Sequence, residues 1–366
     1  MGTRGSDVVE LSQQGDVTRT IVQGHFQGVN KNPEVWGLAV HPNQQKFASA
    51  GADKTVRVWE PSRMIAVSEQ LTHDPTALSW SPDGSLIAVG DRNGSCILLD
   101  ANDLSVKSTY NGSFANKKDA WIEDIKFSPD GTLIAYGNHG GLSPVEVVSV
   151  GPQQKLKKKA TIKVGLTSAL THLDWSMDGS MLMVNSQANE LMFVSVEGRN
   201  QVTASSTKDE SWATMTCLFG WPVQGIWPGL DYTDVNAVDR SRNGTLLATG
   251  DDFGQVKLFK YPSVVEKAGF NDYYGHSSHV TGVKFTHEDT FVISTGGNDK
   301  TVMVWDTDVN DNDQAHFGNQ GAADDDDDEE VKGADDEDDA FAENRLDAAK
   351  EARQGAKAKR QAKEQA

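Results

Sequence analysis

VWGLAVHPNQQKFASAGADKTVRVWE, residues 35–60, carries the pattern that decides the fold. A short alternating segment leads into a polar turn, a run of small and apolar residues follows, and a second turn leads into VRVW. Alternation over about four to six residues between turn residues is typical of short β-strands. VTGVKFTHEDTFVISTGGNDKTVMVWD, residues 280–306, has the same order. The chain therefore repeats one unit built of short strands.

Four further segments between these two follow the same pattern, and they begin at Thr76, Ile122, Leu170 and Val235. Equivalent positions lie 40, 47, 48, 65 and 45 residues apart, at Val40, Trp80, Phe127, Trp175, Arg240 and Phe285. A period of about 40–45 residues predicts the blades of a β-propeller. Because the long fourth interval leaves residues 196–232 free for an irregular blade, the six repeats predict seven blades.

The N-terminal residues predict a way to close the ring. VVEL and VTRTIV, separated by SQQGD within residues 1–23, read as a hairpin. The last repeat ends at Trp305 without an outer strand. We expect the segment at 17–22 to supply it, because closure removes exposed sheet edges. The predicted all-β propeller domain spans residues 1–306.

Charge and low complexity separate the rest of the chain from this domain. Residues 307–342 predict a disordered acidic linker, since 319–342 alone contain twelve Asp or Glu and one Lys. Residues 343–366 contain seven Lys or Arg and four Asp or Glu among strong helix formers. They predict a short, charged, exposed helical tail.

Composition excludes several classes of function. The net charge is −19, and the part before the linker is itself acidic, which argues against nucleic acid and anionic membranes as partners. The sequence has only two cysteines, Cys96 and Cys217, and no apolar run that approaches a membrane span. We therefore expect a soluble protein of a reducing compartment.

Motifs that carry catalysis or bind cofactors are missing from the sequence. It contains no P-loop, no GxGxxG after a strand, no CxxC and no HExxH. We therefore expect no catalytic, cofactor-binding or metal-binding residues, and no enzyme activity. A rigid ring whose loops present a broad face predicts a protein that binds other proteins.

The first and last units resemble the WD repeat. They end in GADKTVRVWE and GNDKTVMVWD, and Gly-His pairs precede them at 24–25 and 275–276. In that repeat a His, a Ser or Thr, a turn Asp and a Trp form a hydrogen-bonded chain inside the blade. The resemblance implies two such tetrads, which are His25, Ser49, Asp53 and Trp59, and His276, Thr295, Asp299 and Trp305. The middle units keep the strand pattern without these residues.

Residues 20–306 also resemble the second, C-terminal propeller of the echinoderm microtubule-associated protein-like family. WATMTC, GIWP, DDFG and GHSSHVT, at 212–217, 225–228, 251–254 and 275–281, are more specific than a general WD pattern. The resemblance implies tubulin, microtubules or a ciliary or flagellar axoneme as partner, and a place in the cytoplasm at the cytoskeleton. The family's coiled coil and basic region, which are tied to microtubule attachment, have no counterpart in these 366 residues. A general WD-repeat scaffold therefore stays open as the alternative.

Two groups of residues are candidates for partner binding, and the sequence does not indicate an oligomeric state. Lys155, Lys157, Lys158 and Lys159 form a basic patch in a predicted loop between strands near Val147 and Ile162. The patch is either a solvated loop or a contact to an acidic protein surface. Trp221 and Trp227 lie in the long interval, where they either pack the extra blade or form an exposed hot spot.

Overall fold

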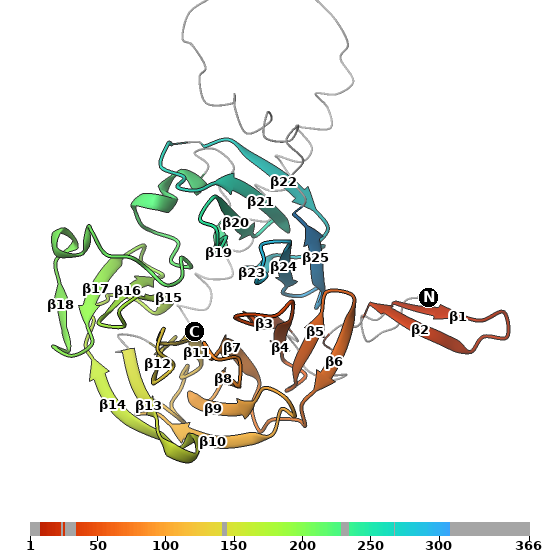
Figure 1. Cartoon of the computed structure of the whole chain (residues 1–366), viewed down its shortest axis with the longest axis horizontal. Helices are drawn as coiled ribbons and strands as arrows, with labels where there is room; N and C mark the ends of the chain where they lie inside the picture. The colour runs from red at the N-terminus through yellow and green to blue at the C-terminus, as the bar shows by residue number, and fades with distance from the viewer. Residues whose placement is uncertain are drawn as a thin grey trace, which may run out of the picture. The chain divides into compact units, whose positions relative to one another are not determined.

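A computed structural model of the chain describes residues 8–22, 25, 34–140, 145–227, 234–266 and 268–307. Six small antiparallel sheets stand around a common axis, and each runs from an inner strand to an outer strand at the rim (Figure 1). Five of these blades have four strands and the sixth has three. The structure confirms the all-β propeller that the repeat predicts.

The blades follow one another in chain order, and consecutive strands pair within each blade. Blade 1 contains β3 (Val35–Val40), β4 (Phe47–Gly51), β5 (Val56–Glu60) and β6 (Arg63–Val67). Blade 2 contains β7 (Pro75–Trp80), β8 (Leu86–Asp91), β9 (Ser95–Asp100) and β10 (Val106–Asn111). Blade 3 contains β11 (Ile122–Phe127), β12 (Leu133–Asn138), β13 (Val145–Val150) and β14 (Leu156–Ile162), with the short 3₁₀ helix η1 (Pro152–Gln154) before β14.

The second half of the ring is less regular. Blade 4 contains β15 (Leu170–Trp175), β16 (Met181–Ser186), β17 (Leu191–Ser195) and the short β18 (Asn200–Val202). Blade 5 contains β19 (Val235–Arg240), β20 (Leu246–Asp251), β21 (Gln255–Lys260) and β22 (Phe270–Tyr274). Blade 6 contains β23 (Val280–Phe285), β24 (Phe291–Gly296) and β25 (Val302–Asp306).

The core lies between the blades. Buried apolar side chains of each pair of neighbouring blades form a cluster of their own. Glycines in the second strand permit this close packing, because a Cβ on Gly90, Gly137 or Gly250 would lie 2.4 Å from a side-chain atom of the next blade. The repeated LIAVG, LIAYG and LLATG endings therefore mark where one blade receives the next.

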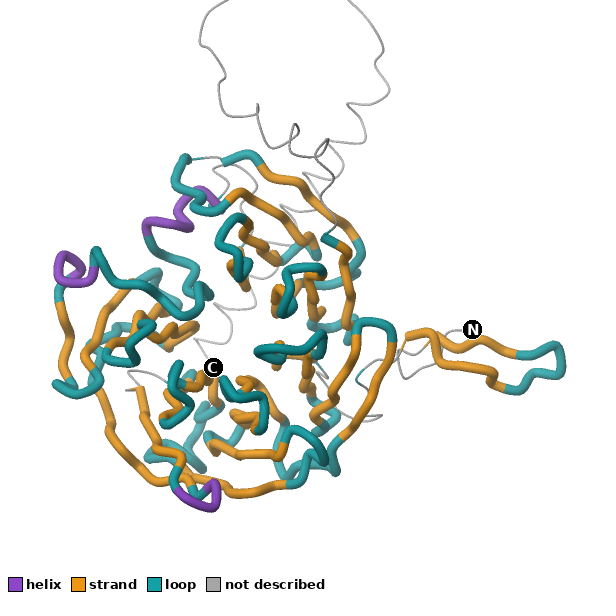
Figure 2. Tube along the Cα trace, in the orientation of Figure 1, coloured by secondary structure: helices purple, strands orange, loops and turns teal. Residues whose placement is uncertain are grey.

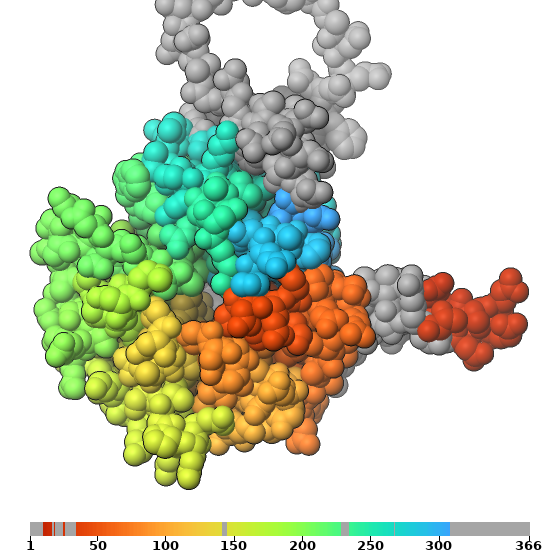
Figure 3. Space-filling view, viewed as in Figure 1, coloured from red at the N-terminus to blue at the C-terminus, as the bar shows by residue number. Residues whose placement is uncertain are grey.

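Hydrogen bonds also join the inner strands around the ring. Thr281 of β23 donates to the carbonyl of Val35 in β3 at 2.5 Å, so the last blade is bonded to the first. Gln45, in the first turn of blade 1, donates to Thr290 in the corresponding turn of blade 6 at 2.9 Å. Figure 3 shows the surfaces of these two blades in contact.

The insert at 203–227 forms no seventh blade, so that expectation is wrong. Its described residues contain the 3₁₀ helices η2 (Ala204–Thr207) and η3 (Trp221–Ile226) and one isolated bridge, between Ser176 and Trp212 (Figure 2). The insert instead fills the joint between blades 4 and 5 with buried side chains, which are Met215, Cys217, Leu218, Val223 and Ile226. The long fourth interval therefore corresponds to a segment that packs between two blades, rather than to an additional sheet.

The N-terminal hairpin is present, but its predicted role is wrong. Strand β1 (Val8–Leu11) pairs with β2 (Val17–Val22) in a separate two-stranded sheet. The sheet of β1 and β2 does not include β25, so residues 17–22 do not add to blade 6. Strand β25 consequently has no fourth strand beside it among the described residues.

The first tetrad forms one continuous hydrogen-bonded chain inside blade 1. The Trp59 indole donates to Ser49 Oγ at 2.8 Å, and Ser49 lies 2.8 Å from His25 Nε2. His25 Nδ1 lies 2.9 Å from Asp53. Burial lowers the pKa of His25 despite Asp53. The pKa of Asp53 is lowered because its bonds to His25 and Arg57 outweigh burial. A neutral imidazole with its proton on Nδ1 therefore bonds a carboxylate.

The second tetrad uses Ser294 where the sequence predicts Thr295. Both the Trp305 indole and His276 Nε2 lie 2.7 Å from Ser294 Oγ, and His276 Nδ1 lies 3.0 Å from Asp299. The loop before Asp299 is one residue longer than its counterpart in blade 1, which displaces the register. Alternate residues of a strand face opposite sides, so Thr295 points away, to Thr281 at 3.0 Å.

Three of the predicted features lie outside the described residues. These are the acidic linker after Thr307, the helical tail at 343–366 and Gly24 of the first Gly-His pair. Within the described part, no helix is both long and apolar enough to cross a bilayer.

Candidate protein-interaction surfaces

A buried charged cluster lies at the axis between blades 3 and 4. The Lys126 ammonium of β11 contacts Asp124 at 2.7 Å and Asp174 of β15 at 3.4 Å. It also donates to Thr216 of the insert. Asp124 in turn accepts the backbone N–H of Leu173 at 2.9 Å. The cluster therefore ties two inner strands and the insert together.

Asp174 is the most enclosed member of this cluster, with a side chain that is 0% exposed. Its carboxylate accepts the backbone N–H groups of Thr216 and Cys217, each at 2.8 Å. Burial alone would raise the pKa of Asp174, but Lys126 and these hydrogen bonds lower it to about 2. The carboxylate is charged at neutral pH and holds the insert against β15.

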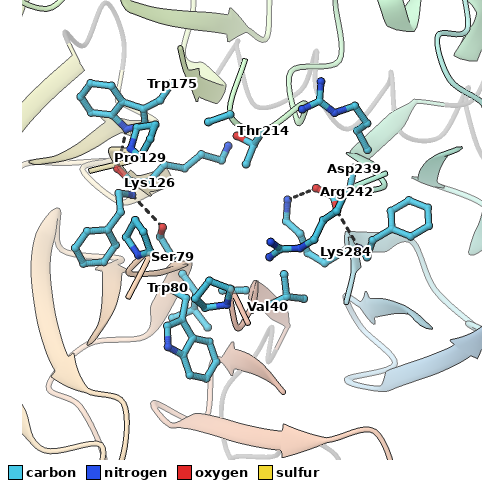
Figure 4. Close-up of a pocket in the computed structure, with 18 of the residues that line it drawn as sticks. Val40, Ser79, Trp80, Lys126, Pro129, Trp175, Thr214, Asp239, Arg242 and Lys284 are labelled. Atoms are coloured by element: carbon cyan, nitrogen blue, oxygen red, sulfur yellow. Dashed lines mark hydrogen bonds and ion pairs between the residues drawn. The ribbon is translucent and has the colours of Figure 1, made fainter. Parts of the chain in front are cut away.

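A cavity of about 460 Å³ opens at the axis, where the inner strands lead into their first turns (Figure 4). Its charged lining residues are four cations, Lys126, Arg240, Arg242 and Lys284, and one carboxylate, Asp239. Lys284 is bonded to Asp239 at 2.7 Å, and Asp239 also accepts the N–H of Phe285 at 2.9 Å. The lining is therefore cationic overall, although the protein is acidic.

Arg242 differs from the other cations of this cavity. Lys126 is bonded within the buried cluster, and Arg240 donates to the carbonyl of Trp212 at 3.0 Å. The Arg242 guanidinium has no hydrogen-bond or ion-pair partner among the residues that the structure describes, and Figure 4 shows it reaching toward the open middle of the cavity. It is available to bind a ligand.

Sequence reasoning missed this cavity, although a signal was present. At equivalent positions the other five units carry Val40, Trp80, Phe127, Trp175 and Phe285, whereas blade 5 carries Arg240. The preceding positions hold Lys126, Asp174, Asp239 and Lys284. Charged residues on the inner strands of an otherwise apolar pattern indicate side chains that face the axis.

The basic patch lies on a strand rather than in the predicted loop. Lys157, Lys158 and Lys159 belong to the outer strand β14, and Lys155 follows η1. Val147 pairs with Ala160 whereas Val148 pairs with Lys158, so Lys159 is the extra residue of a β-bulge. The bulge explains how three consecutive lysines are all exposed on one strand. They form a basic strip at the rim of blade 3.

The lysines of this strip differ in their contacts. Lys158 donates to Ser113 at 3.0 Å and lies 3.8 Å from the buried Glu146. The ammonium groups of Lys157 and Lys159 make no hydrogen bond or ion pair within the described residues and extend into solvent. These two are the better candidates for a partner.

The two tryptophans of the insert have different environments. Trp227 stacks on Phe219 at 5.1 Å and donates to the carbonyl of Leu218 at 3.1 Å. Trp221 begins η3 and is 68% exposed. Trp227 therefore packs the insert, and only Trp221 presents its ring to a partner.

The described residues offer little for metal or redox chemistry. They contain no group of three or more His, Cys, Asp or Glu that could hold a metal ion. Cys96 and Cys217 are free and buried, and burial raises the pKa of both thiols. The cysteines are apolar packing residues.

Six blades around an axis, two of them held by a His–Ser–Trp chain, define a WD-repeat β-propeller. Residues 35–307 match the family model described as the echinoderm microtubule-associated protein second beta-propeller. The chain belongs to this family.

Curated relatives agree with this assignment. Echinoderm microtubule-associated protein-like 2 of Rattus norvegicus is 38% identical over 288 residues, which cover 78% of this chain and 42% of that protein. The 77 kDa echinoderm microtubule-associated protein of Lytechinus variegatus is 37% identical over 308 residues, covering 83% and 44%. Echinoderm microtubule-associated protein-like 1 of Homo sapiens is 35% identical, covering 83% and 36%. The chain thus spans less than half the length of these relatives.

Proposed function

We propose that this chain is a non-catalytic protein-interaction module that associates with microtubules or tubulin, in the cytoplasm at the cytoskeleton. Membership of a family whose members are named as microtubule-associated carries the proposal. A ciliary or flagellar axoneme is one microtubule assembly in which it would act.

The strip on β14 is the contact that we assign to this function. Lys155, Lys157, Lys158 and Lys159 concentrate positive charge on an acidic protein, and Lys157 and Lys159 are exposed without a bonded partner in the described residues. Because the protein is itself acidic, long-range attraction to an acidic partner is not expected. The local basic strip would instead supply attraction at the contact itself. Trp221 is a second exposed side chain of the type that hot spots prefer.

Microtubule co-sedimentation tests the proposal. Lys157→Glu combined with Lys159→Glu should weaken pelleting, and rising salt should weaken the wild-type interaction, because exposed charges are screened over about 10 Å at 0.1 M. The matched control reverses Lys118 and Lys208, which are exposed elsewhere, and should pellet like the wild type. Removal of residues 319–366 should have a much smaller effect than the β14 variant.

Two outcomes would change the assignment. If the β14 variant pelleted normally and the truncated form did not, the contact would lie in residues 319–366. If the intact protein did not pellet at all, the general WD-repeat scaffold of another intracellular complex would replace the microtubule proposal.

A further inference from the structure

The cavity at the axis is a second surface feature, separate from the strip on β14 at the rim. Its charged lining is cationic overall, and the Arg242 guanidinium points into it without a bonded partner in the described part of the chain. Lys126 and Lys284 are already paired with carboxylates of the inner strands. The cations of the lining that no described carboxylate pairs with are Arg240 and Arg242, and a bound anion would reduce the repulsion between them. This makes the cavity a site for an anionic group.

The remaining lining identifies what kind of anion fits. Part of the wall is apolar and consists of Pro42, Pro82, Pro129 and Met177, and Met177 is 57% exposed. Inorganic phosphate would leave these side chains in water. A carboxylate on an aliphatic side chain would use both parts of the lining, since its methylene groups and neighbouring residues can cover the apolar wall.

The geometry of the cations favours a carboxylate as well. A guanidinium presents paired N–H groups that match the two oxygens of a carboxylate. Lys284 lies on the neighbouring blade, where its ammonium is bonded to Asp239. Lys284 lies on the inner strand β23, and Arg242 lies in the turn that directly follows β19.

We propose that the mouth of the axial cavity binds an acidic side chain of an extended partner peptide, with Arg242 as its main ion-pair partner and Lys284 beside it. Pro42, Pro82, Pro129 and Met177 hold apolar residues next to that acidic side chain. The site is independent of microtubule association through β14.

Fluorescence anisotropy on the full chain tests this site. The probe is a labelled peptide of glutamates interspersed with leucines, and its matched peptide has Gln at every Glu position. The wild type should bind the Glu peptide and not the Gln peptide. Arg242→Glu should raise the Kd by about tenfold or more, since a hydrogen bond to a charged group is lost and replaced by repulsion.

Control variants separate a local contact at Arg242 from a general effect of net charge or of misfolding. Lys208→Glu changes the net charge equally and lies outside the cavity lining, so it should leave the Kd unchanged. The β14 variant should also retain peptide binding, which distinguishes this site from the proposed function. Because Arg242 is exposed, Arg242→Glu should keep the wild-type melting midpoint.

Three outcomes would overturn the proposal. Equal affinity of Arg242→Glu and the wild type would remove Arg242 from the site. Equal binding of the Gln peptide would show an apolar contact only. Displacement of the peptide by inorganic phosphate at comparable concentration would show a simple anion site that does not recognise peptides.

Discussion

Blades 1 and 6 and blades 3 and 4 are held by buried polar clusters of different kinds. In blades 1 and 6 the cluster lies inside one blade, where a His, a Ser and a Trp join its strands. Between blades 3 and 4 it lies at the axis, where Lys126 joins Asp124 to Asp174. Blades 3 and 4, which lack the tetrad, are thus joined to each other by a charged cluster in addition to their apolar contacts.

The two kinds of cluster should respond differently when a substitution removes one of their members. Each tetrad is a chain of hydrogen bonds that runs through a Ser hydroxyl, whereas the axial cluster is a buried ion pair. Breaking a buried ion pair leaves an uncompensated charge, which is more destabilising than the loss of a neutral hydrogen bond. The axial cluster should therefore be the more sensitive of the two.

The largest expected effect is at Asp174. Asp174→Ala removes one partner of Lys126 and the acceptor for the insert, so it should lower the free energy of unfolding by about 3–5 kcal/mol. Urea unfolding measures it. The control is Asp178→Ala, on the exposed turn of the same blade, which should lower the free energy of unfolding much less. Equal losses would contradict the central role of the axial cluster.

Acid should weaken the same cluster without mutation. The folded pKa of Asp174 is lowered to about 2 from 3.8, so its contribution is present above pH 3.8 and is lost as the pH falls through 2. That contribution amounts to about 2 kcal/mol. The free energy of unfolding, measured across this range, should fall less steeply for Asp174→Asn than for the wild type. Parallel curves would show that Asp174 does not titrate as described.

The tetrads should give the smallest of these effects. Ser294→Ala leaves His276 and the Trp305 indole without their shared partner, and an unsatisfied buried polar group costs about 1–3 kcal/mol, which urea unfolding would measure. Thr295→Val, in which valine keeps the shape of the threonine that it replaces, should lower the free energy of unfolding less. A larger loss for Thr295→Val would restore the register that the sequence predicts.

Local pattern predicts the fold well because each blade is a local unit. The turn residues and the two-residue alternation predict the position of every inner strand. The first tetrad has the residues that the resemblance to the WD repeat implies, which are His25, Ser49, Asp53 and Trp59. The Thr295 error arises from a single extra loop residue. Without a hydrogen-bond partner in view, the sequence cannot tell which of two adjacent hydroxyls faces inward.

Features that depend on long-range packing could not be predicted in this way. The apolar side chains of the insert pack in the joint between blades 4 and 5, and its backbone N–H groups at Thr216 and Cys217 donate to Asp174 rather than to a neighbouring strand. The sequence alone shows that the strip on β14 is basic, yet only strand pairing shows the bulge that exposes it. Residues of all six blades line the axial cavity, so no single repeat indicates it.

Hydrogen–deuterium exchange of the intact protein, with and without microtubules, tests the proposed interaction most directly. Amides of β14, Leu156–Ile162, should exchange more slowly when microtubules are present, and those of blade 6 should not change. This result would assign the contact to the basic strip. Unchanged exchange in β14 together with protection of another surface would contradict that assignment.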